Sequence, residues 1–458
     1  MKRVLYLATS GQVGGAERCL LSCAAGLRRS GEFLPEVLAG SRGPLFDLLA
    51  EAGVGAHLLP LPAALRRASR FHPLRSVAAR TAALTGAGPR SATPSDPLTL
   101  SRPGTPESPG RLGPRLFAFR GRAAVPSFAA FSRRLCPQCK RRDPRVMWQA
   151  PLYARRLRRA LAALQPAVLH SNGLKMHLLA AMAGAAPPLI WHLHDFPLPD
   201  AASVSNRLLQ HFAPRTAMAV ANSQAVAAAY AERVPALAGK LRVIANGIAP
   251  ESMAGGDGEE FRRRWNLPAD AFVFGMTAIL APWKGHEVFL EAARTVHDAL
   301  PGARFLIVGD DVYDTHGHGH RRALLEARAR DLGLADSVRF TGYLRDGLAA
   351  AYAACDVAVH ASTLPEPFGR TAIEAMAAGV PLIAAAAGGL LEIVEPEQSG
   401  LLTPPGDAAA LGAAMLRLAR EPELRAHLIA GGRARVRERF AEDAINAQWM
   451  DLYREIIG

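Results

Sequence analysis

Short apolar segments alternate with segments of helical periodicity, and this alternation runs through the chain in two series. The first series starts with an apolar run at 2–9, which predicts a buried strand, and continues through a glycine-rich loop into a helix over 16–29. The second series starts near 271. Strands that each lead through a helix into the next strand form parallel sheets. The sequence therefore predicts an α/β fold with two Rossmann-like, doubly wound domains.

The two series give the expected elements and domain limits. The strands expected after the first one are at 36–39, 167–170, 189–192, 217–221, 241–244, 272–277, 304–308, 338–341, 357–360 and 381–385. We expect an N-terminal domain over 1–245 and a C-terminal domain over 246–435. Ligands of such sheets bind beyond the carboxyl ends of the strands, so a cleft that the two domains face is the expected binding site.

The basic charge of the chain is concentrated in one segment. The formal net charge is +14, yet 66–159 holds 21 Lys and Arg against three acidic residues, and the remainder is slightly acidic. Within it, 66–150 is rich in Pro, Ser and Arg without apolar periodicity, which predicts a disordered insertion in the first domain. We expect it to contact anionic membrane lipids or another polyanion; a solvated loop of biased composition is the alternative. With 6% aromatic residues, the chain is not expected to bind nucleic acid specifically.

Cysteine and histidine usage gives no strong metal or disulfide signal. Five cysteines do not make a disulfide framework and fit a reducing compartment. Cys136 and Cys139 could supply half of a zinc site, but no second such pair exists. Alternating histidines at 316–320 are read as an adventitious site. The N-terminal apolar run is too short for a signal peptide, so we expect a cytoplasmic protein, peripheral at the inner face of the plasma membrane.

The most informative stretch runs from Leu364 to Pro381. It places Glu366 in a proline-flanked loop just after a strand and Glu374 one turn inside the following helix. The N-terminus of that helix offers backbone N–H groups and a positive dipole end, which suit a diphosphate. Glu366 can accept hydrogen bonds from sugar hydroxyls, and Glu374 from a ribose. The alternative is a capped surface helix in which Glu374 forms a salt bridge.

This arrangement resembles the E-x7-E motif of the retaining glycosyltransferases of family 4 (glycosyl transferases group 1), which have the GT-B fold. Other motifs of that family occur in the expected order, and the resemblance covers the chain except 66–150. They are Gly14-Gly15-Ala16-Glu17, His194-Asp195-Phe196-Pro197, Asn222-Ser223, Asn246-Gly247, Lys284-Gly285, Gly309-Asp310, Gly342, and Gly388-Gly389 with Glu392. The resemblance also implies that a C-terminal helix, 436–458, crosses back onto the first domain.

The resemblance implies a hexosyltransferase that moves a sugar from a UDP-, GDP- or ADP-sugar to an acceptor with retention of anomeric configuration. The implied acceptor is a cell-envelope glycan or a lipid-linked saccharide, and no cofactor or metal is needed. The implied catalytic residues are His194, Lys284 and Glu366. The donor is held by Gly14, Gly15, Lys284, Glu366, Phe368, Gly369, Arg370, Thr371 and Glu374, and its base lies near Gly342, Tyr343 and Leu344.

One position departs from the family pattern. Ile279 stands where the family has an arginine that pairs with the lysine on the donor phosphates. The loss of such a cation removes a charge-assisted contact of roughly 1.5–3 kcal/mol. Either Arg370 or a residue of the insertion replaces it, or turnover is weak. Two other functions remain open: a nucleotide-sugar-binding protein with little or no activity, which Ile279 suggests, and a sugar-nucleotide epimerase of the same fold, which would need no acceptor.

Overall fold

The computed structural model describes residues 1–67, 144–184, 186–311 and 321–458. Contacts group 1–67 with 144–458 in one compact unit, and the description below concerns that unit. The predictions for the basic insertion, for Cys136 and Cys139 and for the histidines at 316–320 lie outside the described residues. Among the described residues, no helix is long and apolar enough to cross a membrane.

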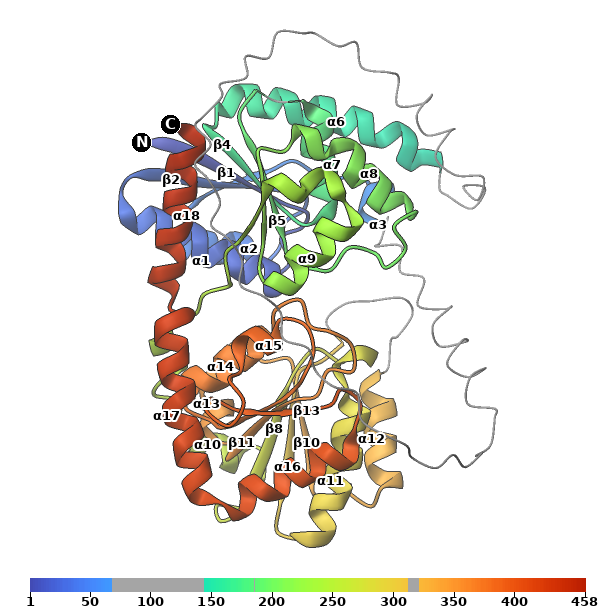
Figure 1. The fold of residues 1–458 in the computed structure, drawn as a ribbon, viewed down its shortest axis with the longest axis vertical. Coiled ribbons are helices and arrows are strands. Elements are labelled where there is room, and N and C mark those ends of the chain that lie inside the picture. Colours follow the sequence, from blue (N-terminus) through green and yellow to red (C-terminus); the bar gives the residue numbers. More distant parts are fainter. Residues whose placement is uncertain (68–143, 185, 312–320) are drawn as a thin grey trace, which may run out of the picture. The chain divides into compact units, whose positions relative to one another are not determined.

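The first sheet has seven parallel strands in the order β3-β2-β1-β4-β5-β6-β7 (Figure 1). The strands are β1 (Lys2–Ala8), β2 (Phe33–Ala39), β3 (Gly55–Leu58), β4 (Val168–Asn172), β5 (Leu189–Leu193), β6 (Met218–Ala221) and β7 (Leu241–Val243). The helices of this half are α1 (Gly15–Ser30), α2 (Leu45–Glu51), α3 (Ala63–Arg67), α6 (Pro144–Leu164), α7 (Leu174–Ala183), α8 (Val204–Phe212) and α9 (Gln224–Arg233), with short 3-10 turns η2 (Ala213–Arg215) and η3 (Pro235–Lys240).

The second sheet has six parallel strands in the order β10-β9-β8-β11-β12-β13. They are β8 (Val273–Thr277), β9 (Arg304–Val308), β10 (Val338–Gly342), β11 (Val357–His360), β12 (Leu382–Ala385) and β13 (Leu401–Thr403). The accompanying helices are α10 (Gly258–Arg264), α11 (His286–Ala299), α12 (Arg321–Asp331), α13 (Leu348–Ala353), α14 (Arg370–Ala378), α15 (Leu390–Ile393) and α16 (Ala408–Arg420), with turns η4 (Pro250–Met253) and η5 (Pro282–Lys284). The predicted fold class, two doubly wound parallel sheets, is confirmed.

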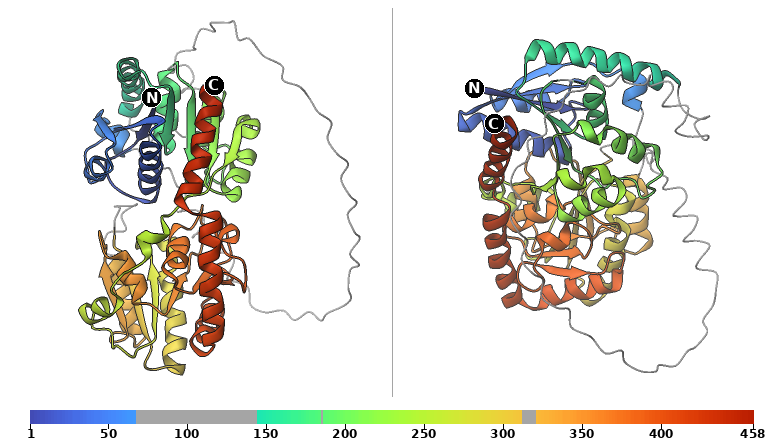
Figure 2. Two further views of the ribbon diagram at one scale, coloured as in Figure 1. Left: turned by 90° about the vertical axis from the view of Figure 1, so that its left-hand side faces the viewer. Right: turned by 45° about the horizontal axis from the view of Figure 1, so that its top comes forward.

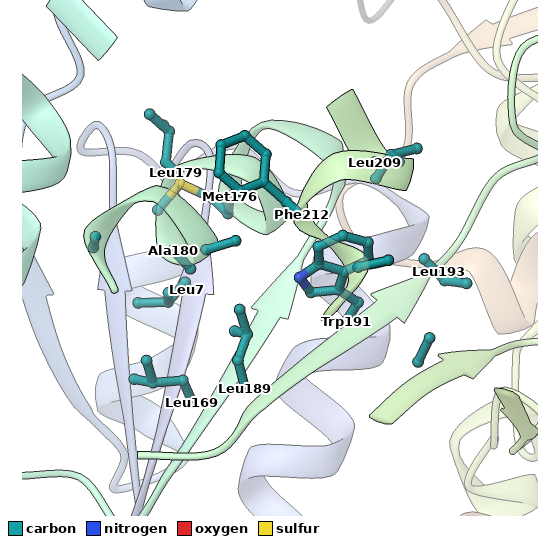
Figure 3. Close-up of a cluster of buried hydrophobic side chains, with 14 of the residues drawn as sticks. Leu7, Leu169, Met176, Leu179, Ala180, Leu189, Trp191, Leu193, Leu209 and Phe212 are labelled. Carbon is teal, nitrogen blue, oxygen red and sulfur yellow. The ribbon is translucent and has the colours of Figure 1, made fainter. Parts of the chain in front are cut away.

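Strand β5 shows how the side-chain period of two divides the first half into two cores. Leu189, Trp191 and Leu193 point into one cluster, which also contains Phe212 of α8 (Figure 3). Ile190 belongs to the cluster on the other face, which includes residues of α1. Because successive side chains of a strand alternate between the two faces, His192 shares the face of Ile190. Five consecutive buried residues therefore read as a continuous run, as is typical of a strand covered on both faces.

Helix α6 corrects the C-terminal limit of the predicted insertion. The helix begins at Pro144, whereas the sequence placed 144–150 in the disordered segment. Val146 packs against the first core cluster and Ala150 is buried in it, so these turns have a reason to be helical. The sequence did not predict the apolar face of α6, because the many arginines on its exposed side dominate the composition of this stretch.

The C-terminal segment forms two helices where one was predicted from 436. Helix α17 spans Pro422–Arg439, and α18 spans Glu442–Ile457 (Figures 1 and 2). Ile248 hydrogen-bonds on both sides of the break between them, through its N–H to Phe440 and its carbonyl to Glu442. The predicted return to the first half is confirmed, since Tyr453 of α18 lies with its hydroxyl 3.1 Å from that of Tyr6 in β1.

In the second sheet, the strand order reverses between β8 and β11, which are neighbours although two strands separate them in the sequence. Their carboxyl ends therefore lie next to each other, and this is where doubly wound sheets bind ligands. The turn after β8 contains η5 and Gly285, whose φ is +78°. A Cβ there would lie 1.9 Å from the carbonyl oxygen of Ala361, in the segment after β11. This close approach requires glycine.

A pair of glycine substitutions tests that requirement. Gly31 also has a left-handed backbone (φ +70°), but a Cβ there would meet nothing within 4 Å. We expect Gly31→Ala to cost about 1 kcal/mol from backbone strain alone, and Gly285→Ala to cost more than about 2 kcal/mol because the clash adds to the strain. Urea unfolding measures both. Equal losses would show that the contact with Ala361 is not tight.

Candidate active site

Lys284 and Glu366 meet beyond the carboxyl ends of β8 and β11. The Lys284 Nζ lies 2.5 Å from Oε1 of Glu366, and the Ser362 hydroxyl donates to the same oxygen at 2.7 Å. Glu366 is only 8% exposed. A buried carboxylate needs a positively charged partner. The ion pair therefore holds Lys284 and Glu366, which are both predicted site residues, next to each other.

Backbone contacts fix the two loops that carry this pair. The Thr363 N–H donates to the Trp283 carbonyl at 2.8 Å, which joins η5 to the segment after β11. On the other side, the Gly389 N–H donates to the Glu366 carbonyl at 2.8 Å. Glu366 is therefore held by its backbone as well as by Oε1 of its carboxylate. Its other carboxylate oxygen, Oε2, takes no part in these contacts and can accept a hydrogen bond from a ligand.

The surroundings keep Glu366 ionised. Burial by itself would raise the pKa of Glu366, but the charges of Lys284 and His360 and the hydrogen bonds from Lys284 and Ser362 lower it below its usual value. Burial lowers the pKa of His360 to about 4, so this histidine is neutral near pH 7. The site thus combines an anionic acceptor of hydrogen bonds with a cation 2.5 Å away.

At the start of α14, Arg370 and Glu374 form a second ion pair. Arg370 Nε lies 2.9 Å from Glu374 Oε1, one helical turn further along. The alternative to a ribose contact was a salt bridge of Glu374 on a surface helix. The salt bridge is present, but Glu374 is buried. Arg370 Nη1 is buried and has no hydrogen-bond partner among the described residues. A buried guanidinium donor without a partner at a helix N-terminus is suited to an anion.

The glycine loop after β1 gives its two glycines different roles. The Gly14 N–H donates to Oε2 of Glu17 at 3.1 Å, inside the first turn of α1. Gly15 begins that helix, and a Cβ there would meet nothing within 4 Å. The Gly14 amide is thus already bonded, and Gly15 is the position of the pair beside open space.

His194 lies one residue beyond β5, half-buried, with its Nε2 hydrogen-bonded to Oδ1 of Asn172 at the end of β4. Behind it lie two buried histidines that the sequence analysis did not single out. His170 Nε2 and His192 Nδ1 are 3.0 Å apart, and burial lowers the pKa of both rings. The sequence does contain a signal for His192: it lies two residues before His194, and residues two apart in an extended segment share one face.

Three residues are predicted to lie near the nucleobase. Gly342 is the last residue of β10, and Tyr343 and Leu344 begin the loop that follows it. Gly342 is bonded through its carbonyl to the Gly309 N–H at 3.0 Å, and Leu344 packs against a core cluster. Tyr343 is 48% exposed. Of the three, Tyr343 therefore has the exposed side chain.

Two family models match the chain. The model for glycosyl transferases group 1 matches 257–435, and the model for glycosyltransferase family 4 matches 106–252. The chain belongs to the family 4, group 1 glycosyltransferases. Each model matches one half, so both halves carry the family's sequence pattern.

Curated relatives and solved structures extend the comparison. A D-inositol 3-phosphate glycosyltransferase of Thermomonospora curvata is 38% identical over 38% of this chain and 41% of its own. The lipopolysaccharide core biosynthesis glycosyltransferase LpsD of Rhizobium meliloti is 34% identical over 41% of this chain and 50% of its own. The chain thus spans about half the length of the curated relatives that it matches.

Solved structures show the fold. Anabaena HepE in complex with UDP-glucose has a TM-score of 0.73 at 24% identity and covers 99% of this chain and 100% of its own. A sucrose-phosphate synthase from Thermosynechococcus elongatus has a TM-score of 0.68 at 21% identity, covering 100% and 99%. At these identities the likeness concerns the fold.

The depressed pKa of His360 predicts a pH dependence of stability. The unfolded histidine takes up a proton near pH 6.5 and the folded one only near pH 4, so stability present above pH 6.5 is lost as the pH falls toward 4. By this linkage, His360→Gln should reduce the loss between pH 7 and 4.5 by about 2 kcal/mol. Urea unfolding at several pH values measures it, with exposed His427→Gln as the matched control. An unchanged pH dependence in His360→Gln would contradict the assignment.

Proposed function

We propose that the chain transfers a sugar from a nucleotide-sugar donor to a hydroxyl acceptor, with retention at the anomeric carbon. The observation that carries this proposal is the Lys284–Glu366 pair, beside two neighbouring strand ends where the order of the sheet reverses. Family membership gives the reaction class, and the site has the charges that a donor diphosphate and its sugar require.

The donor diphosphate would be bound by cations and backbone amides. We propose Lys284, the N-terminus of α14 and the Gly15 amide as its contacts. Arg370 supplies the charge that Ile279 cannot, because its Nη1 is a buried donor without a partner among the described residues. UDP-, GDP- and ADP-sugars all carry the diphosphate. UDP-glucose is the first to test, because the structural neighbour HepE is described in complex with UDP and with UDP-glucose.

The proposed reaction needs no cofactor. The bond between the anomeric carbon and the β-phosphate oxygen breaks with its electron pair going to that oxygen. The acceptor oxygen bonds to the same face of the carbon, and its proton passes to the leaving phosphate. Lys284 and Arg370 stabilise the departing charge, Glu366 accepts hydrogen bonds from the sugar hydroxyls, Glu374 from the ribose, and His194 lies at the reacting sugar.

The acceptor is proposed from the relatives. Those curated relatives are named for inositol 3-phosphate and for the lipopolysaccharide core, which are both hydroxyl-bearing acceptors. We propose a cell-envelope glycan or a lipid-linked saccharide, used on the cytoplasmic side of the plasma membrane.

Calorimetry with UDP, GDP and ADP tests the donor site. We expect one of them to bind, and Glu374→Gln to weaken that binding about 10-fold or more, since it removes a charge-assisted hydrogen bond. Gly15→Val should also weaken it while leaving the unfolding free energy unchanged, because the new side chain points into open space. Glu423→Gln, exposed in the first turn of α17, is the matched control.

The outcomes separate the alternatives. Failure of all three nucleotides to bind the wild type would contradict the donor site. Binding without release of nucleoside diphosphate from any sugar donor, across an acceptor series, would favour the inactive binding protein that Ile279 suggests. Release of nucleotide that needs no acceptor, with an epimerised sugar as product, would favour the epimerase.

We further propose that the exposed side of α6 rests on an anionic membrane. Trp148 and Leu152 are 74% and 57% exposed, and Arg155 and Arg159 continue the same helical stripe. An exposed aromatic and aliphatic pair beside arginines is typical of a helix at the membrane interface. The stripe adjoins the basic segment in which the sequence predicted membrane contact.

Vesicle sedimentation tests this contact. Full-length chain should bind vesicles containing phosphatidylglycerol and not neutral phosphatidylcholine vesicles. Replacing Trp148 and Leu152 with Ser and Arg155 and Arg159 with Gln should lower binding at least 10-fold, whereas Leu324→Ser, an exposed leucine on α12, should not. Undiminished binding of the fourfold variant would assign the contact to 68–143 instead and overturn the role of α6.

A further inference from the structure

A thiol and two imidazoles converge beside the first sheet, and none of the three belongs to the two ion pairs of the donor site. Cys19 of α1, His192 of β5 and His194 just beyond it place one ligand atom each within 4.8 Å of one another. Cys19 and His192 are buried, and the two imidazole rings are 3.9 Å apart. Thiolate sulfur and imidazole nitrogen are the ligands that zinc prefers in proteins.

A buried chain of hydrogen bonds orients His192. Its Nδ1 is 3.0 Å from Nε2 of His170, whose Nδ1 is 2.6 Å from the Tyr453 hydroxyl. When Nδ1 of His192 donates into this chain, the lone pair is on Nε2. That atom is buried and has no hydrogen-bond partner among the described residues. Metal-binding histidines are commonly held in this way, by a partner on the second ring nitrogen.

Asn172 orients His194 in the same manner. The Asn172 Nδ2 donates to the Ala16 carbonyl at 3.2 Å, so its Oδ1 is the atom that faces Nε2 of His194. Because an amide oxygen only accepts, Nε2 of His194 carries a proton, so that in the neutral ring the lone pair is on Nδ1. Both rings thus have a second partner that sets their tautomer before any ligand arrives.

We propose that Cys19 Sγ, His192 Nε2 and His194 Nδ1 bind a zinc ion, with a fourth position for water. In a tetrahedral site such ligand atoms are roughly 3.3–3.6 Å apart, so side-chain shifts of about 1 Å close the site. Binding replaces the thiol proton of Cys19, which goes to solvent. The half-buried His194 gives the ion its route in.

The consequence of this site rests on the proposed function of His194. A zinc ion on His194 removes that imidazole from the reacting sugar and adds positive charge there. Zinc would therefore inhibit transfer reversibly. This ion would not take part in binding the diphosphate, which is proposed to be bound by Lys284 and Arg370.

Cobalt substitution tests the site, in full-length chain from which the other metal-binding motifs have been removed (Cys136→Ser, Cys139→Ser, and Gln at His316, His318 and His320). We expect one Co²⁺ per chain, with a near-ultraviolet thiolate-to-metal charge-transfer band that zinc displaces. Cys19→Ser should abolish the band, and His192→Gln should weaken binding at least 10-fold. Cys355→Ser, a cysteine of the second half, should keep both.

The result that overturns the proposal is a full band in Cys19→Ser, or no Co²⁺ bound by the background chain. Inhibition by zinc is then measured as a ratio to the metal-free rate of each variant, and Cys19→Ser should lose at least 10-fold in sensitivity. If the chain shows no transfer at all, the band still reports the metal site, so failure of the proposed function and failure of this inference are distinguishable.

Discussion

The buried carboxylate of Glu366 sets the arrangement of the whole candidate site. An ionised group with 8% exposure is costly unless it is paired, and Lys284 is the cation within reach. To bring the lysine there, the turn after β8 must pass against Ala361, which only glycine at 285 allows. Since a buried ion pair adds little net stability, its value is positional: it holds a cation and an anion side by side at two strand ends.

The two halves use the same plan for different chemistry. In both sheets the strand order reverses beside the first strand, β1 or β8, and the loops at the carboxyl ends carry the notable residues. The second half offers paired charges and a helix N-terminus, which suit a diphosphate. The first half offers imidazoles, an amide and a thiol, which suit hydroxyl groups or a soft metal ion.

Most of the fold could be predicted, because strands buried on both faces appear as apolar runs. Two strands were not predicted: β3, which is largely exposed and so shows no apolar run, and the short β13. The predictions for Glu366, Arg370 and Glu374 come from one short stretch, Leu364 to Pro381, whereas those for Lys284 and the Gly14-Gly15 loop come from the family resemblance. The group of Cys19, His192 and His194 was not predicted, since it depends on α1 packing against the face of β5 that carries His192, a contact between segments far apart in the sequence.

The most direct test of the donor site is a crystal structure of the chain with the nucleoside diphosphate that binds it best. The account predicts the β-phosphate within hydrogen-bond distance of Lys284 Nζ and Arg370 Nη1 at the N-terminus of α14, with the ribose hydroxyls on Glu374. A nucleotide bound elsewhere, or one in which Lys284 stays paired with Glu366 alone and Arg370 contacts no phosphate, would contradict it.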